Sequence, residues 1–400
     1  MKIAIITNLY PPYSRGGAEV VITRTVTELL AAGHKVSVIT TRPFGGLSTL
    51  IPRLEERSNE AIYRFYPLNL YHSLRDFKHP APLRLLWHLI DTLNPLNAFL
   101  VRNVLKEIQP DIIWTHNLKG IGLMIPRALR RLPIPHVHQV HDVQLSVPSG
   151  LIIAGSEKPP CCIRLCRWLY TELCKRLMGS PALVISPSRF LKEFYERRGF
   201  FKKSQVRVIM NPAPRTHTLP RVQRSSGALR LLCVSQLEEH KGVRFLIHCL
   251  KSSHLSFELT IASEGRLAEY VRQVGKADRR FNHVGFLAMD QLIKLFQMAD
   301  ALVVPSLCYE NSPTVIYEAL QSGLPVVAAD IGGVAELIHE GENGFLFTPG
   351  DCQDLLSTLS TLDTEKDRLF ATSASIRATV ADLAIEKYVA RLSELFENLR

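Results

Sequence analysis

The sequence predicts an α/β protein of two domains, each built on a parallel sheet. Short apolar, β-branched runs alternate with stretches of helical period along the whole chain, which is typical of parallel sheets with helical crossovers. A length of 400 residues exceeds what one ordinary hydrophobic core serves. Residues 211–227, rich in Pro, Ser and Arg, have the composition of a linker, and we place the domain boundary there.

Thirteen segments have the length and composition of buried strands. Seven precede the linker, at residues 2–7, 35–40, 61–65, 111–115, 135–140, 182–185 and 206–209. Six follow it, at residues 229–234, 257–261, 281–284, 301–304, 325–328 and 344–347. Residues 382–399 then carry an apolar stripe of helical period, so we predict a C-terminal helix.

Two segments interrupt this alternation. Residues 43–60 are polar and rich in turn formers, and they predict an exposed loop. Residues 82–93 form one apolar helical face flanked by Arg84 and His88, with Leu83, Leu86, Trp87 and Ile90 on it. Such a face either packs on its own domain or lies on a membrane surface, and periodicity alone leaves both open.

The net charge of +11 is unevenly distributed. Residues 1–200 hold 26 Lys and Arg against 14 Asp and Glu, whereas residues 201–400 hold 22 against 23. A basic first half suits an anionic membrane, an acidic lipid or a phosphorylated acceptor, but it equally suits a merely soluble basic face. Nucleic acid is disfavoured as a partner, because no motif that reads RNA or DNA accompanies the charge.

The eight cysteines do not suggest a disulfide framework. The N-terminus lacks the pattern of a secretory signal and no apolar run reaches 18 residues, so we expect a cytoplasmic protein with reduced thiols. Four cysteines cluster at Cys161, Cys162, Cys166 and Cys174. Their spacing is not that of two CxxC pairs, so buried or idle thiols are favoured over a metal or redox site.

Gly16 and Gly17 mark the first strand-to-helix turn. Two glycines at a helix N-terminus let a phosphate approach exposed backbone N–H groups and the positive end of the helix dipole. The spacing is not GxGxxG, so a nicotinamide site is not predicted.

The segment after the strand at 301–304 carries more chemistry. Pro313 suits the first turn of a helix, which directs the N–H groups of Thr314 and Val315 toward the edge where open α/β sheets bind ligands. Glu310 precedes this helix and Glu318 lies about one turn inside it. Two carboxylates there suit the hydroxyls of a sugar, although two solvated glutamates at a helix start would have the same spacing.

Further glycine-rich junctions follow at residues 323–327, 330–336 and 341–345. Residues 301–350 together resemble the core signature of the retaining glycosyltransferases of family four, which adopt the GT-B fold. Further segments resemble the landmarks of that family, at residues 16–19, 141–142, 186–188, 211–212, 234–237 and 241–242. The resemblance spans nearly the whole chain and is loosest at residues 43–180, where acceptor specificity usually resides.

The resemblance implies two Rossmann-like domains that face each other across a cleft. Residues 1–210 would form the acceptor-side domain, 211–227 a linker and 228–379 the domain that binds the nucleotide-sugar donor. The helix at 380–400 would pack back on the first domain.

The resemblance also implies roles for individual residues. Lys241 would neutralise the donor diphosphate, and the N–H groups of Thr314 and Val315 would bind the same phosphates. Glu318 would hold the ribose hydroxyls, and Glu310 would bind and align the transferred sugar.

Further roles follow from the same resemblance. Leu287, in the turn at 286–288, would line the base pocket, and Gly16 and Gly17 would face the phosphates. His141 would lie near the reacting sugar or the acceptor hydroxyl, with Asp142 orienting or supporting it. No metal or other cofactor is implied, and the chain has no Asp-x-Asp pair placed to hold a metal beside a diphosphate.

Two departures from the family pattern concern the donor site. Gln236 stands where the family usually has an arginine, after Ser235 in place of a glycine. A neutral amide hydrogen-bonds but does not neutralise charge, so another cation such as Arg244 or Arg266 would have to replace it. Ser263-Glu264-Gly265 replaces Gly-Asp-Gly and affects only the local turn.

We therefore predict a metal-independent, retaining glycosyltransferase that uses a UDP- or GDP-sugar. The acceptor is expected to be a cell-envelope or polysaccharide molecule, either lipid-linked or polymeric, with an optional peripheral contact to an anionic membrane. The alternative is a non-catalytic subunit that binds a sugar nucleotide and supports a partner enzyme, for which Gln236 is the main argument. An epimerase or phosphorylase of the same fold fits the Glu310–Glu318 pattern less well.

Overall fold

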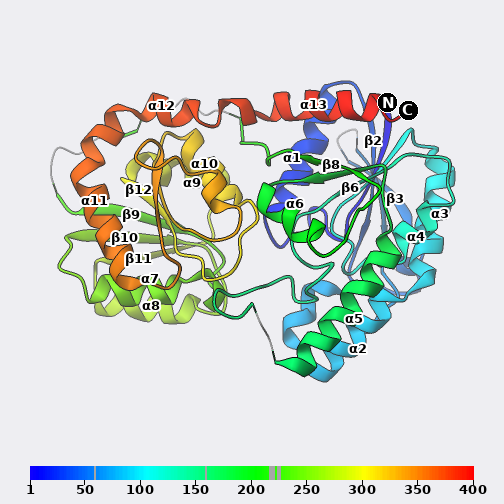
Figure 1. Ribbon diagram of the computed structural model, residues 1–400, viewed down its shortest axis with the longest axis horizontal. Coiled ribbons are helices and arrows are strands. Elements are labelled where there is room, and N and C mark those ends of the chain that lie inside the picture. Colours follow the sequence, from blue (N-terminus) through cyan, green and yellow to red (C-terminus); the bar gives the residue numbers. More distant parts are fainter. Residues whose placement is uncertain (58–59, 158–159, 216–220, 223–226) are drawn as a thin grey trace. The chain divides into compact units, whose positions relative to one another are not determined.

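The computed structural model describes residues 1–57, 60–157, 160–215, 221–222 and 227–400. The chain divides into two compact units (Figure 1). Unit 1 comprises Met1–Leu151, Pro159–Met210 and Ile385–Arg400, and unit 2 comprises Ile152–Lys158 and Asn211–Ala384. Both units are α/β, as the sequence predicts.

Unit 1 is built on an eight-stranded sheet of order β3-β4-β2-β1-β5-β6-β7-β8. All its neighbouring strands are parallel except β3 and β4. The inner strands are short, nearly continuous apolar runs, because helices cover both faces of a parallel sheet. The strands are β1 (Lys2–Ile6), β2 (Lys35–Thr41), β3 (Arg53–Arg57), β4 (Glu60–Phe65), β5 (Ile112–Thr115), β6 (His136–Gln139), β7 (Leu183–Ser186) and β8 (Gln205–Val208).

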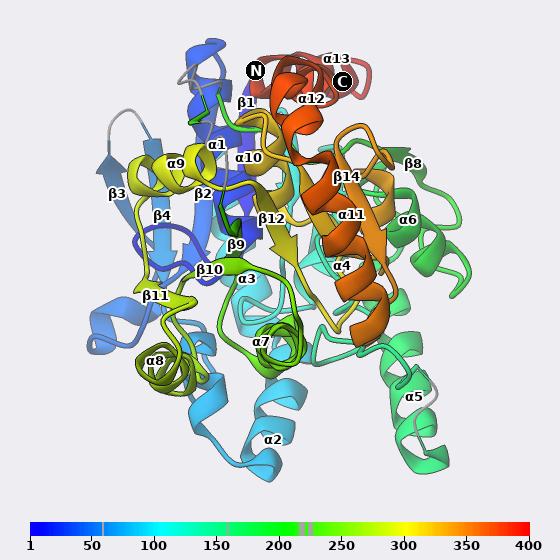
Figure 2. The same ribbon diagram turned by 90° about the vertical axis from the view of Figure 1, so that its left-hand side faces the viewer.

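The helices of unit 1 begin at recognisable caps. The Asn94 side chain accepts from two N–H groups at the start of α3, and the Ser188 hydroxyl accepts from one at the start of α6. Helices α2 and α5 lie at the same end of unit 1 in both views (Figures 1 and 2). The helices are α1 (Gly17–Ala31), α2 (Ala81–Thr92), α3 (Pro95–Ile108), α4 (Ile125–Leu129), α5 (Cys161–Met178), α6 (Arg189–Glu196) and α13 (Ile385–Glu397), with the short turns η1 (Leu47–Leu50) and η2 (Ser73–Lys78).

The C-terminal helix α13 belongs to the core of unit 1. Its Tyr388, Leu392 and Phe396 are buried in the same cluster as the side chains of β1 and α1. The Phe396 ring meets that of Trp114 edge to face at 5.4 Å, and the Tyr388 hydroxyl lies 3.2 Å from the Gln139 amide nitrogen. The buried stripe explains why a helix so far along the sequence packs beside α1 (Figure 1).

Unit 2 is built on a six-stranded parallel sheet of order β11-β10-β9-β12-β13-β14. Its strands are β9 (Leu229–Val234), β10 (Phe257–Ala262), β11 (Phe281–Gly285), β12 (Ala301–Val304), β13 (Val326–Ala329) and β14 (Gly344–Phe347). Its helices are α7 (Val243–Lys251), α8 (Ala268–Ala277), α9 (Met289–Met298), α10 (Thr314–Gln321), α11 (Cys352–Ala371) and α12 (Ser373–Ala378), with the short turns η3 (Glu239–Lys241), η4 (Val334–Glu336) and η5 (Ala381–Leu383).

All thirteen predicted strands are present, each within two residues of its predicted bounds. The prediction of an exposed loop at residues 43–60 is wrong in part, because β3 pairs antiparallel with β4 from Arg53↔Arg64 to Arg57↔Glu60. The strand sequence Arg-Leu-Glu-Glu-Arg has almost no apolar residue and is mostly exposed. Charged edge strands of this kind give no hydrophobic signal to a sequence search. Residues 58–59 lie outside the described residues.

Residues 152–158 depart from the predicted domain boundary. They belong to unit 2 rather than to the first domain, because Ile153 pairs with Cys308 and the Ala154 N–H donates to the Leu307 carbonyl at 2.9 Å. In the predicted linker, Arg221 is buried and donates to the carbonyls of Ala299 and Gly323. Residues 216–220 and 223–226 of the linker lie outside the described residues.

The apolar face predicted at residues 82–93 forms helix α2. Trp87 is buried and its Nε1 donates to the Tyr71 carbonyl at 2.7 Å, while Leu83 and Ile90 are half-buried. Leu86, which the prediction placed on the same face, is 47% exposed. The helix therefore packs on unit 1 through Trp87, whereas Leu85, Leu86 and Leu89 are exposed.

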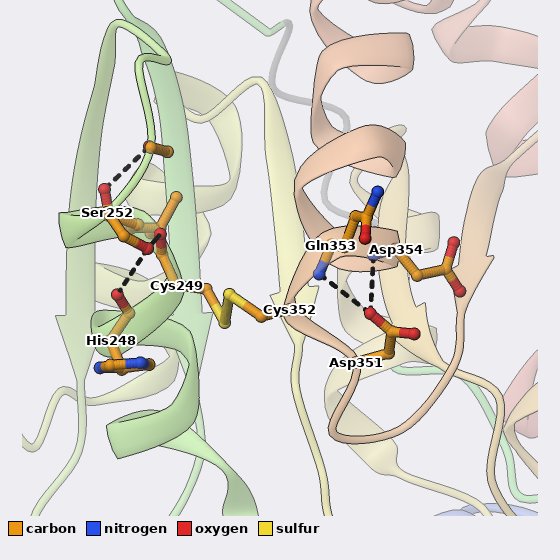
Figure 3. Close-up of a disulfide and its surroundings, with 9 residues drawn as sticks. His248, Cys249, Ser252, Asp351, Cys352, Gln353 and Asp354 are labelled. Atoms are coloured by element: carbon orange, nitrogen blue, oxygen red, sulfur yellow. Dashed lines mark hydrogen bonds between the residues drawn. A yellow bond between two sulfur atoms is a disulfide. The ribbon is translucent and has the colours of Figure 1, made fainter.

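A disulfide joins two helices of unit 2, contrary to the expectation of reduced thiols. Cys249 of α7 and Cys352, the first residue of α11, have Cα atoms 5.4 Å apart and a sequence separation of 103 (Figure 3). Helix packing alone brings them together, which sequence spacing does not reveal. Cys161, Cys162 and Cys166 are exposed free thiols, whereas Cys174 is buried. Over the described ranges, no group of three or more His, Cys, Asp or Glu side chains is arranged to hold a metal ion.

Candidate functional site

Unit 2 brings Lys241 and Glu310 together. The Lys241 Nζ donates to Glu310 Oε1 at 2.5 Å, and the Ser306 hydroxyl donates to the same oxygen at 2.7 Å. Lys241 ends the turn that follows β9, while Ser306 and Glu310 follow β12, the neighbouring strand. The pair therefore stands at the carboxyl ends of parallel strands, the edge at which open α/β sheets bind ligands.

Two glycines allow the loops of this pair to approach closely. Gly242, directly after Lys241, has a φ of +74°, and a Cβ there would lie 1.7 Å from the Pro305 carbonyl oxygen. Gly332 has a φ of +68°, and a Cβ there would lie 2.1 Å from the Glu310 carbonyl oxygen. A side chain at either position would push the loops apart, so glycine is required for the pair to form.

The two charges of the pair stabilise each other. Burial alone raises the pKa of Glu310, but the Lys241 ammonium and the Ser306 hydroxyl together hold that pKa below its ordinary value. Burial alone lowers the pKa of Lys241, and the Glu310 carboxylate reverses this, so the pKa of Lys241 is raised. Both groups are therefore ionised at neutral pH, and the site keeps a fixed positive charge and a fixed acceptor side by side.

Helix α10 places its first turn in the segment after Glu310. Pro313 is its N-cap, and Thr314 and Val315 are its first two residues, both half-buried. The first N–H groups of a helix have no partner within the helix and attract anions. Glu318, one turn further along, is 7% exposed. Thr314, Val315 and Glu318 therefore occupy the helix positions that the sequence predicts for them.

Gln236 lies exposed after β9. The two arginines that could supply the missing positive charge, Arg244 and Arg266, have different surroundings. Arg244 pairs with Glu239 and covers the Tyr270 ring at 4.1 Å. The Arg266 side chain is 63% exposed, with its Nε 3.7 Å from Glu238 Oε2.

The loop that carries Arg266 is hydrogen-bonded to the loop of Gln236. The Leu237 N–H donates to the Glu264 carbonyl, and the Leu267 N–H donates to the Leu237 carbonyl. Arg266 is therefore the arginine that the backbone fixes beside Gln236. Leu287 is half-buried in the turn between β11 and α9.

The turn at Gly16 and Gly17 holds a carboxylate of its own helix. Gly16 caps α1, and its N–H donates to Glu19 Oε2 at 2.7 Å. Glu19 is 5% exposed, and burial raises its pKa despite these N–H bonds. An anion at the Gly16 N–H would have to displace this carboxylate, and the role of Gly16 and Gly17 toward a phosphate stays a prediction. Gly17 begins the helix and is exposed.

Unit 1 has a pocket of its own, at the carboxyl ends of β5 and β6. Among its lining residues are His116, Lys119, His141, Asp142, Tyr170 and Tyr195. His141 Nε2 lies 2.9 Å from His116 Nδ1, and the two rings stack with centroids 5.2 Å apart. Burial lowers the pKa of His141 to about 4, so the imidazole is neutral at pH 7. His136 and His138 instead share the Thr115 hydroxyl within the sheet.

Asp142 supports the loop that carries His141. Its Oδ1 accepts from the Gln144 N–H at 2.8 Å, and its carbonyl oxygen accepts from the Tyr195 hydroxyl at 2.6 Å. Burial raises the pKa of Asp142 to about 6. These contacts hold the loop in place, and the orienting role of Asp142 toward His141 stays a prediction.

Lys119 also lines the pocket, and the carboxylate of Asp91 lies behind it, bound to the N–H of Gly120. Burial lowers the pKa of Lys119, although Asp76, Asp142 and Asp91 each act in the opposite direction. Asp91 Oδ2 accepts from the Gly120 N–H at 2.9 Å, and its Oδ1 is buried with no partner among the described residues. Burial raises the pKa of Asp91 to about 7.

Four of these groups, Ser306, Lys119, Asp91 and Tyr170, are not among the site residues that the sequence predicts. Ser306 follows a predicted strand and could have been found as a polar residue at a strand end. Lys119, Asp91 and Tyr170 come from loops and helices whose burial only the tertiary structure reveals. Asp91 in particular is the one acid of α2, a mostly apolar helix, and sequence alone predicts that such a carboxylate is exposed to solvent.

Two family models match the chain. Residues 228–364 match the model described as glycosyl transferases group 1, and residues 15–215 match glycosyltransferase family 4. An uncharacterized 42.6 kDa protein in the cps region of Klebsiella pneumoniae is 26% identical over 339 residues, which is 84% of this chain and 87% of that protein.

Two solved structures share the fold over the whole chain. Sucrose-phosphate synthase from Thermosynechococcus elongatus superposes with a TM-score of 0.76 at 19% identity, covering 100% of this chain and 98% of that one. Alr3699/HepE of Anabaena in complex with UDP gives a TM-score of 0.70 at 19% identity, covering both chains completely. These likenesses are of the GT-B fold. The chain belongs to glycosyltransferase family 4 and is a glycosyltransferase of the GT-B type.

Proposed function

We propose that this chain transfers a sugar from a nucleoside-diphosphate sugar to a hydroxyl acceptor, with retention at the anomeric carbon and without a metal ion. The observation that carries the proposal is the ionised pair of Lys241, which follows β9, and Glu310, which precedes helix α10. A fixed ammonium beside the start of a helix suits a diphosphate, and a fixed carboxylate suits sugar hydroxyls.

In this proposal the donor groups divide the work. Lys241 and the N–H groups of Thr314 and Val315 bind the diphosphate and neutralise the charge that builds on it as the glycosidic bond breaks. Glu318 holds the ribose, Glu310 aligns the transferred sugar, and Leu287 lines the base pocket. Uridine is the base we favour over guanosine, since the solved neighbour from Anabaena holds UDP.

The proposed chemistry needs no strong general base. The acceptor oxygen attacks from the face that the leaving diphosphate vacates, and a phosphate oxygen of the leaving group takes the acceptor proton. His141 is neutral at pH 7, so it can accept a hydrogen bond from the acceptor hydroxyl without adding positive charge. Lys241 supplies the cationic stabilisation that a metal supplies in other enzymes.

The pocket of unit 1 is the acceptor site in this proposal. Its histidines, carboxylate and tyrosines offer many hydrogen-bonding groups, which is what a polyhydroxylated acceptor requires. Unit 1 also carries a net charge of +15, from 31 Lys and Arg against 16 Asp and Glu, which suits a phosphorylated or acidic envelope acceptor.

Product analysis tests the proposal. The purified chain is incubated with UDP- and GDP-sugars in the presence of EDTA, with an extract of envelope lipids and oligosaccharides as acceptor, and the product anomer is read by NMR. A product that keeps the anomeric configuration of the donor supports the proposal. An inverted product, or transfer that needs added metal, overturns the mechanism. Donor binding without transfer to any acceptor, in wild type and Gln236→Arg alike, would favour a supporting subunit instead.

A further inference from the structure

Helix α2 presents leucines to the outside of unit 1. Trp87 and Asp91, on its inner face, are buried. On the opposite face Leu85, Leu86 and Leu89 are 73%, 47% and 55% exposed. The exposed apolar surface continues past the helix end, with Leu93, Leu96 and Phe99 each about half exposed or more. Surface helices of soluble domains show the reverse pattern, apolar inside and polar outside.

Helix α5 exposes a second apolar surface. Its buried residues, including Cys174 and Met178, all lie from Thr171 onward. In the preceding two and a half turns the large apolar side chains are each more than half exposed, namely Ile163, Leu165, Trp168 and Leu169. The first half of α5 therefore projects from unit 1, while its second half anchors it. Both helices lie at the same end of the unit (Figures 1 and 2).

The exposed charges around these two helices are basic. The acids of residues 73–92, Asp76 and Asp91, are both buried, and residues 161–171 contain no acid. Basic side chains flank the apolar surface on α2, on α5 and on the turn η2 that precedes α2, namely Arg75, Lys78, Arg84, Arg164 and Arg167. An apolar helical face with a basic border and an exposed Trp has the composition of an interfacial membrane helix.

Helix α5 lines the unit 1 pocket, and helix α2 is hydrogen-bonded to the loop that forms one of its walls. Tyr170 of α5 lines the pocket and directly follows the exposed Trp168 and Leu169. Asp91 of α2 accepts from the Gly120 N–H, and Gly120 adjoins Lys119 in the pocket wall. Whatever covers the apolar surface of α2 and α5 is thus held close to the pocket.

We propose that the exposed faces of α2 and α5 dock on an anionic lipid bilayer and hold the pocket of unit 1 at the lipid surface. The bilayer is the occupant that matches both the leucines and the basic border, since phosphate headgroups pair with the cations while acyl chains receive the apolar side chains. Among the described residues no helix is long and apolar enough to cross a membrane, so the contact is interfacial. The docking itself does not depend on the proposed function. Its consequence, that the acceptor is carried by lipid, rests on the proposed function.

Vesicle sedimentation tests the docking surface. The full chain is mixed at low salt with vesicles of phosphatidylcholine alone or of phosphatidylcholine and phosphatidylglycerol in equal parts. We expect binding to the anionic vesicles that falls steeply with added salt. The variants Leu86→Ser with Leu89→Ser, and Trp168→Ser with Leu169→Ser, should each reduce binding at least about tenfold, and Lys78→Glu with Arg164→Glu should do the same.

Leu47→Ser with Ile51→Ser is the matched control, because these side chains of unit 1 are 79% and 65% exposed but lie outside both helices. It should bind vesicles as the wild type does. UDP binding measured on every variant separates this proposal from the donor site, and it should be unchanged throughout.

Three results would overturn the proposal: no binding of the wild type to anionic vesicles at low salt, an equal loss in the control, or a dimer in solution that the leucine variants dissociate, which would make a second copy the occupant.

Discussion

Lys241 Nζ and Ser306 Oγ both donate to one oxygen of Glu310, at 2.5 Å and 2.7 Å. The ammonium is therefore fixed by a carboxylate from the neighbouring strand end before any ligand binds. A diphosphate that binds there meets a charge already in position, which is how electrostatic stabilisation acts without reorganisation cost.

Replacing Lys241 tests this arrangement. Lys241→Ala removes the charge that does most to compensate Glu310 and should lower transfer by about 10²–10³ in kcat/KM. It should also lower the free energy of unfolding by about 3 kcal/mol, since it leaves a mostly buried carboxylate unpaired. Steady-state transfer and urea unfolding measure the two effects. Lys241→Ala combined with Glu310→Gln should recover the stability and leave the activity low, and recovery of activity would contradict the assigned role.

Replacing Asp91 tests the buried acid of α2. The folded protein raises the pKa of Asp91 to about 7 from 3.8, so the native state holds this proton more tightly than the unfolded state does. The stabilisation that protonated Asp91 provides is complete below the pKa of Asp91 in the unfolded state. It is lost as the pH rises through the pKa of Asp91 in the folded state. Relative to Asp91→Asn, the wild type should lose on the order of 3 kcal/mol between about pH 5 and pH 8.

Asp76→Asn is the control for that pH series. Burial raises the pKa of Asp76, but Lys119, Tyr71 and Arg84 together hold it below its ordinary value. Its stabilising effect is present above the unfolded pKa and is lost only at acid pH, so its difference from wild type should stay flat over the same interval. Parallel curves for the two variants would contradict the assignment of a protonated Asp91.

Replacing Gln236 tests whether the missing arginine limits the enzyme. Gln236→Arg places a permanent cation at an exposed position after β9, and we expect kcat/KM to rise about tenfold. Arg266→Ala should lower it by a similar factor, because Arg266 lies on the loop that is hydrogen-bonded to the Gln236 loop. Arg244→Ala is the control and should have little effect, since Arg244 pairs with Glu239. If Arg244→Ala is the more damaging variant, the compensation is assigned to the wrong arginine.

Reduction of the Cys249–Cys352 disulfide should destabilise unit 2. The bond closes a loop of 103 residues, for which chain entropy gives about 4.7 kcal/mol. Thermal unfolding with and without a reductant measures the loss, and Cys249→Ala with Cys352→Ala should be insensitive to reductant. Equal reductant sensitivity in that double variant would show that other cysteines carry the effect. Because Cys249 is fully buried, a denaturant is needed to ensure complete reduction.

The fold could be predicted because each buried strand of the two sheets is a short apolar run between helical stretches. The edge strand β3 could not be predicted, because Arg53–Arg57 buries no apolar face. Its backbone hydrogen bonds to β4 do not depend on a pattern of side chains. Within the site, Glu310 and the start of α10 could be predicted from a strand end and from Pro313, which are local signals, whereas Lys241 was predicted only from the resemblance to the family.

The rest of the site depends on contacts between distant segments. Glu19 lies three residues after Gly16, yet the sequence did not indicate that its carboxylate would occupy the Gly16 N–H. Asp91 and Lys119 meet only because α2 packs against the loop after β5. The periodicity of residues 82–93 leaves open whether the face with Leu86 packs or lies on a membrane surface, because α2 is apolar on both its buried and its exposed side.

Titration of UDP into the wild-type chain in the presence of EDTA, followed by calorimetry, tests the central claim most directly. The account predicts saturable binding of UDP without metal, and its loss in Lys241→Ala while the fold of that variant is intact by circular dichroism. Absence of binding for UDP, GDP and ADP alike, or full binding by Lys241→Ala, would contradict the donor site described for unit 2.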